Sequence, residues 1–136
     1  MQHLKVDNPE KLVTAYSGIV SSKGESKTVS RGGSDLRKLD EMGSTYEFVI
    51  TYTYKPGRFA KEKTVVAIVP VKRAMNRLFE CNTDEVTFRI LAFKKGNFEE
   101  EWSGDLGKAK SEIPDVVQAF EEDIADLVSA VGAKTG

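Results

Sequence analysis

Few residues of this 136-residue chain belong to the types that carry enzyme chemistry. His3 is the only histidine, so a Ser-His-Asp or Cys-His arrangement would depend on a side chain close to the N-terminus. Cys81 is the only cysteine, which excludes an internal disulfide and any zinc site built from cysteines. The chain contains no glycine-rich phosphate-binding loop. We therefore expect a protein that has no catalytic residues and needs no metal or cofactor.

Two acidic runs, residues 99–101 and 121–123, are the remaining candidates for a metal site. Consecutive carboxylates rarely converge on one ion, because neighbouring side chains of a strand or helix point in different directions. Both runs are therefore interpreted as solvated acidic surface.

Basic and aromatic side chains are interleaved in the middle of the chain, a pattern that suits contact with nucleic acid. Cations hold phosphates, and aromatic rings stack on bases. The alternative interpretation is that the rings form a core face and the lysines protect exposed strand edges. The cations are Lys55, Arg58, Lys61, Lys63, Lys72, Arg73, Arg77, Arg89, Lys94 and Lys95, with Tyr52, Tyr54, Phe59 and Phe93 among them.

The net charge of −1 hides an uneven distribution along the chain. Residues 1–95 carry 17 Lys or Arg against 11 Asp or Glu, whereas residues 96–136 carry 3 against 10, so the two parts have charges of +6 and −7. This asymmetry predicts one surface that attracts anions and another that repels them. The composition, 40% hydrophobic and 30% charged, is typical of one soluble globular domain. No apolar run approaches the roughly 20 residues that span a bilayer, so we expect no membrane partner.

The stretch from residue 45 to residue 72 has the strongest structural signal. Tyr46, Phe48, Ile50, Tyr52 and Tyr54 alternate with more polar residues, which is the pattern of a half-buried strand. The run from 64 to 71 is apolar on both faces, and Pro56-Gly57 favours a turn between the two. We predict a central antiparallel hairpin whose second strand needs cover on both sides.

The flanking segments predict an antiparallel meander. Residues 1–11 are interpreted as an N-terminal arm, and residues 12–136 as a single α+β domain. Residues 12–21 and 27–30 are predicted to form an early hairpin, and residues 34–43 a short helical turn. Residues 73–84 are ambiguous between a helix and a loop, and residues 85–95 and 98–102 are predicted strands. An apolar stripe over residues 111–131 predicts a C-terminal amphipathic helix, with Ser111 as its N-cap, packed on one face of the sheet.

The order and spacing of these elements resemble the coat proteins of single-stranded RNA bacteriophages. The resemblance rests on the early hairpin, the unit built around KPGRFAKEK, and the strand DEVTFRIL followed by an acidic helix. It implies a non-enzymatic virion subunit that forms homodimers, assembles into a shell and binds RNA on the sheet. The implied RNA-binding residues are Thr51, Thr53, Lys55, Lys63, Thr87 and Arg89.

Two other classes of protein fit the same pattern. One is a bacterial accessory or scaffold domain, in the cytoplasm or the envelope, that binds another protein through a sheet edge. The other is a carrier that holds a small ligand between helix and sheet. Retention of RNA that depends on salt would favour the coat subunit, a clean monomer the scaffold, and a co-purifying apolar ligand the carrier.

Overall fold

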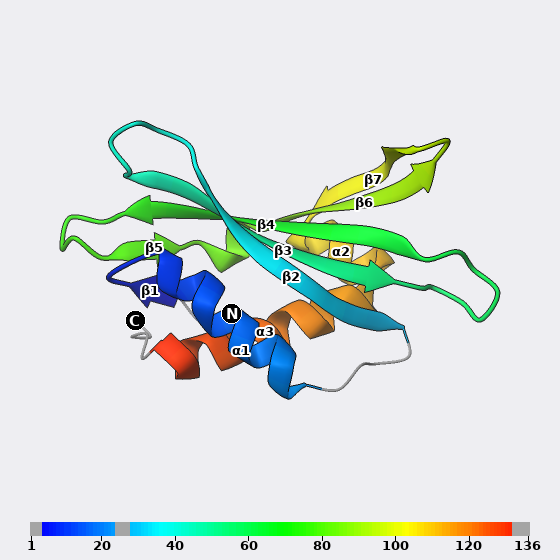
Figure 1. The fold of residues 1–136 in the computed structure, drawn as a ribbon, viewed down its shortest axis with the longest axis horizontal. Coiled ribbons are helices and arrows are strands. Elements are labelled where there is room, and N and C mark those ends of the chain that lie inside the picture. The colour runs from blue at the N-terminus through cyan, green and yellow to red at the C-terminus, as the bar shows by residue number, and fades with distance from the viewer. Residues whose placement is uncertain (1–3, 24–27, 132–136) are drawn as a thin grey trace.

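The chain forms one curled antiparallel sheet with its helices packed against one face (Figure 1). The computed structural model describes residues 4–23 and 28–131. The helices are α1 (Glu10–Ser22), α2 (Leu106–Glu112) and α3 (Pro114–Val131), with a short 3-10 turn at Thr83–Glu85. The strands are β1 (Leu4–Val6), β2 (Val29–Lys38), β3 (Thr45–Tyr54), β4 (Lys63–Arg73), β5 (Phe79–Cys81), β6 (Thr87–Lys94) and β7 (Asn97–Asp105). This arrangement confirms the predicted α+β class with a C-terminal helix on one face of the sheet.

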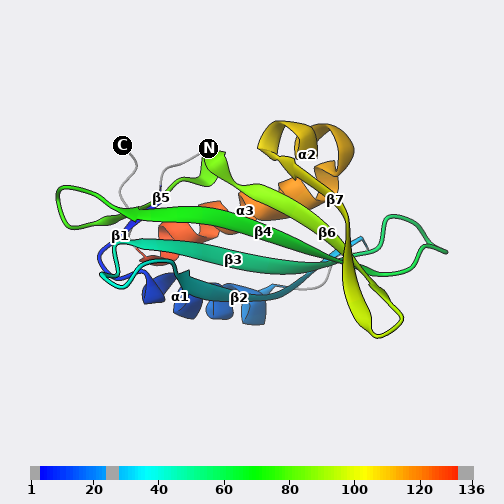
Figure 2. The ribbon, with the colours of Figure 1, turned by 90° about the horizontal axis from the view of Figure 1, so that it is seen from above.

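Strand β4 is the centre of the sheet. It pairs with β3 along its whole length, and its other edge is shared between β6 at residues 64–68 and β5 at residues 71–73. The described strands follow the order β1-β5-β4-β3-β2, while β6 leaves β4 to pair with β7 (Figure 2). The sheet therefore divides at β4, and the β6–β7 hairpin diverges from β5 and β1.

The core lies between the sheet and the two longer helices. Phe48, Ile50 and Tyr52 of β3 point toward the helices and are fully buried, as the alternation in the sequence predicts. Phe88 of β6 and Phe120 of α3 pack edge to face, with ring centroids 5.4 Å apart. Burial of a side chain of this size contributes roughly 1.5–3 kcal/mol to folding. This core fixes which face of the sheet remains open.

The predicted central hairpin is confirmed. In the described structure, helices cover only one face of its second strand, β4, and leave the other face without cover. Val65, Ala67, Val69 and Val71 of β4 are buried against the helix side, and the residues between them stay half-buried on the opposite face. We call this opposite face, which Figure 2 views from above, the open face.

The prediction of an early hairpin was wrong, because residues 12–21 belong to helix α1. Leu12, Tyr16 and Ile19 are spaced by four and three residues and are all buried, so the helical period decides the structure despite the β-branched neighbours. Asn8 Oδ1 accepts a hydrogen bond from the Glu10 N–H at 3.0 Å and satisfies one free donor of the first turn. The segment that would join the two predicted strands, residues 22–26, lies mostly outside the described residues.

The N-terminal segment is not the loose arm that its polar composition predicts. Leu4 and Val6 are buried, and β1 pairs with β5 so that Leu4 lies opposite Cys81 and Val6 opposite Phe79. Helix α1 begins within the same segment, at Glu10. The two buried side chains hold β1 in the sheet. A strand of three residues is too short to show an alternating pattern in the sequence.

The helical turn predicted at residues 34–43 is wrong, because residues 34–38 form the second half of β2 and residues 39–43 lie in the connection to β3. Gly32 and Gly33 do not end this strand but form a bulge, where the register with β3 shifts between Arg31 and Ser34. A Cβ atom on Gly32 would lie 2.9 Å from the carbonyl oxygen of Thr51, so a larger residue does not fit there. The bulge lets β2 continue beside β3 as far as Lys38.

The remaining predictions were corrected in detail. The ambiguous residues 73–84 contain β5, and the strands at 85–95 and 98–102 are confirmed as β6 and β7. The C-terminal helix is two helices, because Pro114 lacks an N–H and disfavours helical geometry in the residue before it. Asp105, not Ser111, is the N-cap of α2, and its side chain accepts a hydrogen bond from the Lys108 N–H at 2.9 Å.

Candidate functional site

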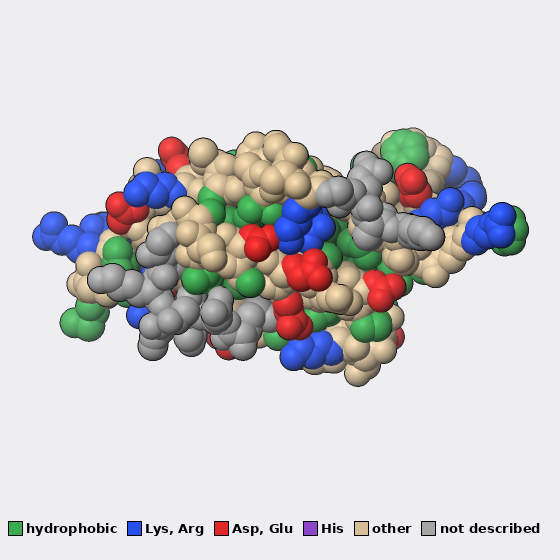
Figure 3. Space-filling model, turned by 90° about the horizontal axis from the view of Figure 1, so that it is seen from below, with side chains coloured by type: hydrophobic (Ala, Val, Ile, Leu, Met, Phe, Trp, Pro, Cys, Tyr) green, Lys and Arg blue, Asp and Glu red, His purple; other side chains and the backbone are tan. Residues whose placement is uncertain are grey.

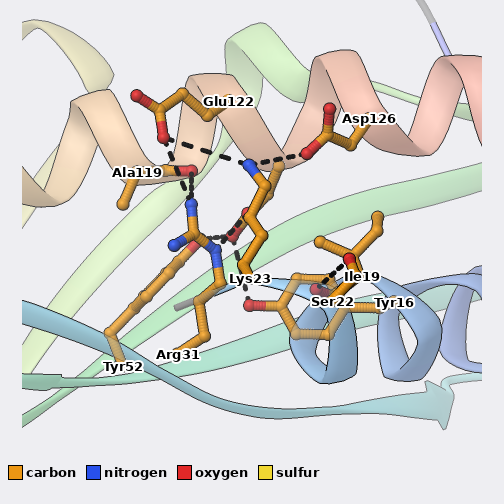
Figure 4. Close-up of polar contacts among 10 residues, drawn as sticks. Tyr16, Ile19, Ser22, Lys23, Arg31, Tyr52, Ala119, Glu122 and Asp126 are labelled. Atoms are coloured by element: carbon orange, nitrogen blue, oxygen red, sulfur yellow. Dashed lines mark hydrogen bonds and ion pairs between the residues drawn. The ribbon is translucent and has the colours of Figure 1, made fainter. Parts of the chain in front are cut away.

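A buried carboxylate joins four elements in the interior of the protein. Asp123 of α3 is fully buried, and its Oδ2 accepts hydrogen bonds from the hydroxyl groups of Tyr52 in β3 and Tyr16 in α1, at 2.7 and 3.1 Å. Its Oδ1 accepts a hydrogen bond from the Arg31 Nε of β2 at 2.5 Å (Figure 4). Such a network is satisfied internally, which is the condition for a stable buried charge.

A shell of partly exposed ion pairs surrounds this network. The Arg31 Nη2 lies 3.4 Å from both the Ala119 carbonyl oxygen and the Glu122 carboxylate. Lys23, directly after α1, lies 2.6 Å from Asp126 and 4.0 Å from Glu122. Figure 4 shows these side chains converging from α1, β2 and α3. The shell therefore ties both ends of the α1–β2 connection to one side of α3.

The environment of the network shifts the protonation of its tyrosines. Burial and the adjacent Asp123 carboxylate raise the pKa values of Tyr16 and Tyr52 well above the ordinary tyrosine value. Both phenols therefore remain protonated donors at neutral pH. Because the carboxylate is enclosed by its own partners, the arrangement serves to lock α3 against α1 and the sheet.

The sequence carried a signal for this network that the analysis of acidic runs missed. Asp123 lies three residues after Phe120 and four before Leu127, which places it on the apolar stripe of α3. A carboxylate on such a stripe needs a buried partner. The run 121–123 is thus solvated at Glu121 and Glu122 but buried at Asp123.

Four of the six predicted RNA-binding residues share the open face. The strand registers place Thr51 beside Val66 and Arg89 in one row, and Thr53 beside Thr64 in the next. Thr87 lies opposite Ile68 on the same face. Lys55 follows β3 in the exposed connection. Lys63 is two residues before the buried Val65 of β4, so its side chain points to the helix side of the sheet and not to the open face.

Three of the six polar side chains in this predicted set are engaged within the chain. The Arg89 Nε lies 2.5 Å from a Glu100 carboxylate oxygen, and the Lys63 Nζ lies 2.6 Å from Glu101. The Thr51 hydroxyl accepts a hydrogen bond from the Gly33 N–H at 3.1 Å. Among the three cations of the set, Lys55 is the exception, since no described carboxylate forms an ion pair with it. The open face therefore offers a half-buried apolar strip and few free cations.

The exposed large apolar side chains lie at the two ends of the sheet, together with cations (Figure 3). We call residues 55–63 and 93–98 the aromatic end, because they include Phe59, Phe93 and Phe98, which are 94%, 64% and 60% exposed. We call residues 37–44 and 72–78 the methionine end, because they include Met42 and Met75. The aromatic end carries six Lys or Arg and one Glu, and the methionine end carries five Lys or Arg and two acidic residues.

The described residues offer little for binding a metal. They contain no group of three or more His, Cys, Asp or Glu side chains that could hold a metal ion. Cys81 is buried, and burial raises the pKa of its thiol to about 12, so it is a poor nucleophile at neutral pH. A hollow of about 300 Å³ lies between α1 and β2, lined in part by Tyr16, Val20 and Gly33. This volume is at the lower limit for a ligand pocket, whereas a hollow of about 790 Å³ between α1 and the end of α3, lined in part by Ile19 and Val131, is within the usual range.

Comparisons with protein-family models, with curated proteins and with solved structures give no match for this chain. Among the helices of the described residues, none is long and apolar enough to cross a membrane.

Proposed function

We propose that the protein is a non-enzymatic structural protein that associates with copies of itself through the open face of its sheet. The proposal depends on the apolar strip of that face, formed by Val49, Val66, Ile68 and Leu91. These side chains are half-buried in the single chain, and no described helix covers them. Two sheets pack face to face about 10 Å apart, so a second copy would remove this strip from water.

The specific form that we propose is a virion coat subunit that contacts RNA. It is supported by the order of the central hairpin, β6 and the C-terminal helix, which resembles that of RNA bacteriophage coat proteins. The early hairpin no longer contributes to the likeness, because those residues form α1. The protein covers the helix side of its sheet with its own α1 and α3, so association is expected on the open face.

Light scattering after size exclusion, with absorbance at 260 and 280 nm across the same peak, tests the proposal. We expect a mass well above the 15.0 kDa of one chain and a raised 260/280 ratio. Ile68→Lys places a charge on the strip without disturbing the core and should return the protein to a single chain. Gln118→Lys on the exposed side of α3 adds the same charge elsewhere and should leave the mass unchanged. A wild-type protein that elutes as one chain would reject self-association.

A second candidate, a scaffold domain that binds another protein by strand addition, is favoured by the edge of β7. In the described sheet β7 pairs with β6 alone, and its exposed residues include Glu99, which forms no ion pair with a described residue, as well as Glu100 and Glu101, which do. An acidic strand edge suits an extended basic segment, whose main chain would pair with β7. An NMR titration with a lysine-rich extended peptide should then shift the β7 amides first. Shifts confined to other strands would reject this candidate.

A further inference from the structure

We infer that the aromatic end of the sheet binds single-stranded nucleic acid, with phosphates on its cations and bases on its phenylalanine rings. The inference rests on the RNA contact of the proposed function, but it moves that contact from the open face to the β3–β4 connection and the β6–β7 hairpin. Figure 1 shows these two hairpin tips extending toward the same end of the molecule.

The cations of the aromatic end differ in whether they are free. Lys63 and Lys94 both bind Glu101, with their Nζ atoms 2.6 and 3.2 Å from its two carboxylate oxygens. No described carboxylate forms an ion pair with the remaining cations of this end, which are Lys55, Arg58, Lys61 and Lys95. An anionic ligand gains most from cations that are not already neutralised, because no internal pair must be broken. These free cations are the expected phosphate contacts.

The rings of this end are exposed beside those cations. The Arg58 guanidinium lies over the Phe59 ring, 5.7 Å from its centroid, and the other side of that ring remains open. Phe93 and Phe98 lie opposite each other across the β6–β7 hairpin, with centroids 5.1 Å apart. Exposed rings next to unpaired cations suit a strand in which bases and phosphates alternate.

Two features hold this surface in place. The Glu101 carboxylate bridges the first residue of β4 and the last residue of β6, so the β3–β4 connection is tied to the β6–β7 hairpin. Beside the β3–β4 connection, a hollow of about 530 Å³ is lined by Thr28, Lys55, Pro56, Gly57 and Arg58. The Lys55 N–H donates to the Thr28 carbonyl oxygen at 2.8 Å and fixes the start of the connection. A ligand therefore meets two cations around a concave surface.

The methionine end supplies a matched comparison within the same molecule. Lys72, Arg73 and Arg77 are exposed there and make no ion pair with a described residue, but the exposed apolar side chains are Leu39, Met42 and Met75. The net charges of the aromatic and methionine ends are both positive, +5 and +3, whereas base stacking favours only the end with aromatic rings. The difference between them separates stacking from simple electrostatic attraction.

Fluorescence anisotropy with labelled oligo(U) and oligo(dT), measured over a series of salt concentrations, tests this inference. We expect Lys55→Ala/Arg58→Ala/Lys61→Ala to weaken binding at least tenfold, and the slope of log K against log salt to fall by about 0.7 per cation removed. Lys72→Ala/Arg73→Ala/Arg77→Ala removes the same charge and should change the affinity less than twofold. Phe59→Leu should weaken binding about tenfold, since a leucine cannot stack on a base. Equal loss from the two triple variants would overturn the inference.

The remaining outcomes distinguish the inference from the proposal on which it rests. If Arg89→Ala weakens binding and the Lys55/Arg58/Lys61 variant does not, RNA contacts the open face. The inference about the aromatic end is then wrong, while the proposed RNA contact still holds. If the wild-type protein binds neither oligonucleotide at low salt, the RNA contact fails, while self-association is still decided by light scattering. Sedimentation with phosphatidylserine vesicles covers a lipid partner: vesicle binding retained by Phe59→Leu, without oligonucleotide binding, would overturn the inference.

Discussion

The Arg31 Nε lies 2.5 Å from Asp123 Oδ1, joining β2 to α3 across 92 positions of the sequence. The same carboxylate accepts hydrogen bonds from Tyr16 and Tyr52, so one side chain connects both long helices to the sheet. A charge buried in this way depends on all its partners at once. The stability of the protein should therefore be most sensitive at this position of α3.

Replacing Asp123 with asparagine should lower the free energy of unfolding by about 3 kcal/mol. The substitution keeps the size of the side chain but leaves the largely buried Arg31 guanidinium without its counter-charge. Urea denaturation followed by circular dichroism measures the change. Glu121→Gln removes a charge from the exposed side of the same helix and should stay within about 0.5 kcal/mol of wild type. Similar stabilities for the two variants would contradict a central role for the network.

The two buried tyrosines should make the protein less stable in alkaline solution. Burial and the Asp123 carboxylate raise the pKa values of Tyr16 and Tyr52 above the ordinary value of 10.0. The contribution of these tyrosines to folding stability is therefore complete below pH 10 and is lost as the pH rises further. In that range the tyrosines of the unfolded chain ionise, while those of the folded chain stay protonated. Each tyrosine should contribute a slope of about 1.4 kcal/mol per pH unit in that window.

Denaturation curves between pH 9 and pH 11 measure this effect, with tyrosinate absorbance as a second readout. Tyr16→Phe should be less stable than wild type at neutral pH but lose stability less steeply above pH 10. A slope unchanged by this substitution would show that Tyr16 ionises equally in both states.

The two adjacent glycines of the β2 bulge should respond differently to alanine. A Cβ atom at Gly32 would lie 2.7 Å from the Thr51 hydroxyl oxygen and 2.9 Å from the Thr51 carbonyl oxygen, and backbone cannot move aside cheaply. We expect Gly32→Ala to destabilise the protein by about 1–3 kcal/mol. At Gly33 nothing lies within 4 Å of such an atom, so Gly33→Ala should be neutral or slightly stabilising. Thermal denaturation of the pair tests the bulge geometry, and equal losses would contradict it.

Cys81 should report the opening of the sheet near β5. It is buried opposite Leu4 of β1, and burial raises the pKa of its thiol to about 12. Reaction with a disulfide reagent at pH 8 should therefore be slow in the native protein and fast in urea. Leu4→Ala removes a buried neighbour and should accelerate the native reaction, whereas Leu39→Ala at the exposed methionine end should not. Rapid labelling of the native wild-type protein would show that β1 opens readily.

The sequence by itself determined the elements whose pattern is long and unambiguous. The alternation along β3 specified both a strand and its buried face, and the stripe on α3 specified an amphipathic helix, because each pattern repeats over several turns or pleats. The sequence also identified the cations and aromatic rings around the KPGRFAKEK connection as one group. It did not show that the cations are divided between two ends of the molecule, because that depends on where each hairpin points.

Only the tertiary structure decided the secondary structure of segments that suit both a strand and a helix. It alone also decided the contacts between residues far apart in the sequence. Residues 12–21 suit a strand by composition and a helix by spacing, and the burial of Leu12, Tyr16 and Ile19 against the sheet selected the helix. The Asp123 network brings together residues 71, 92 and 107 positions apart. Local preference carries no information on such distances, because only packing of α3 across the sheet places these side chains within hydrogen-bonding reach.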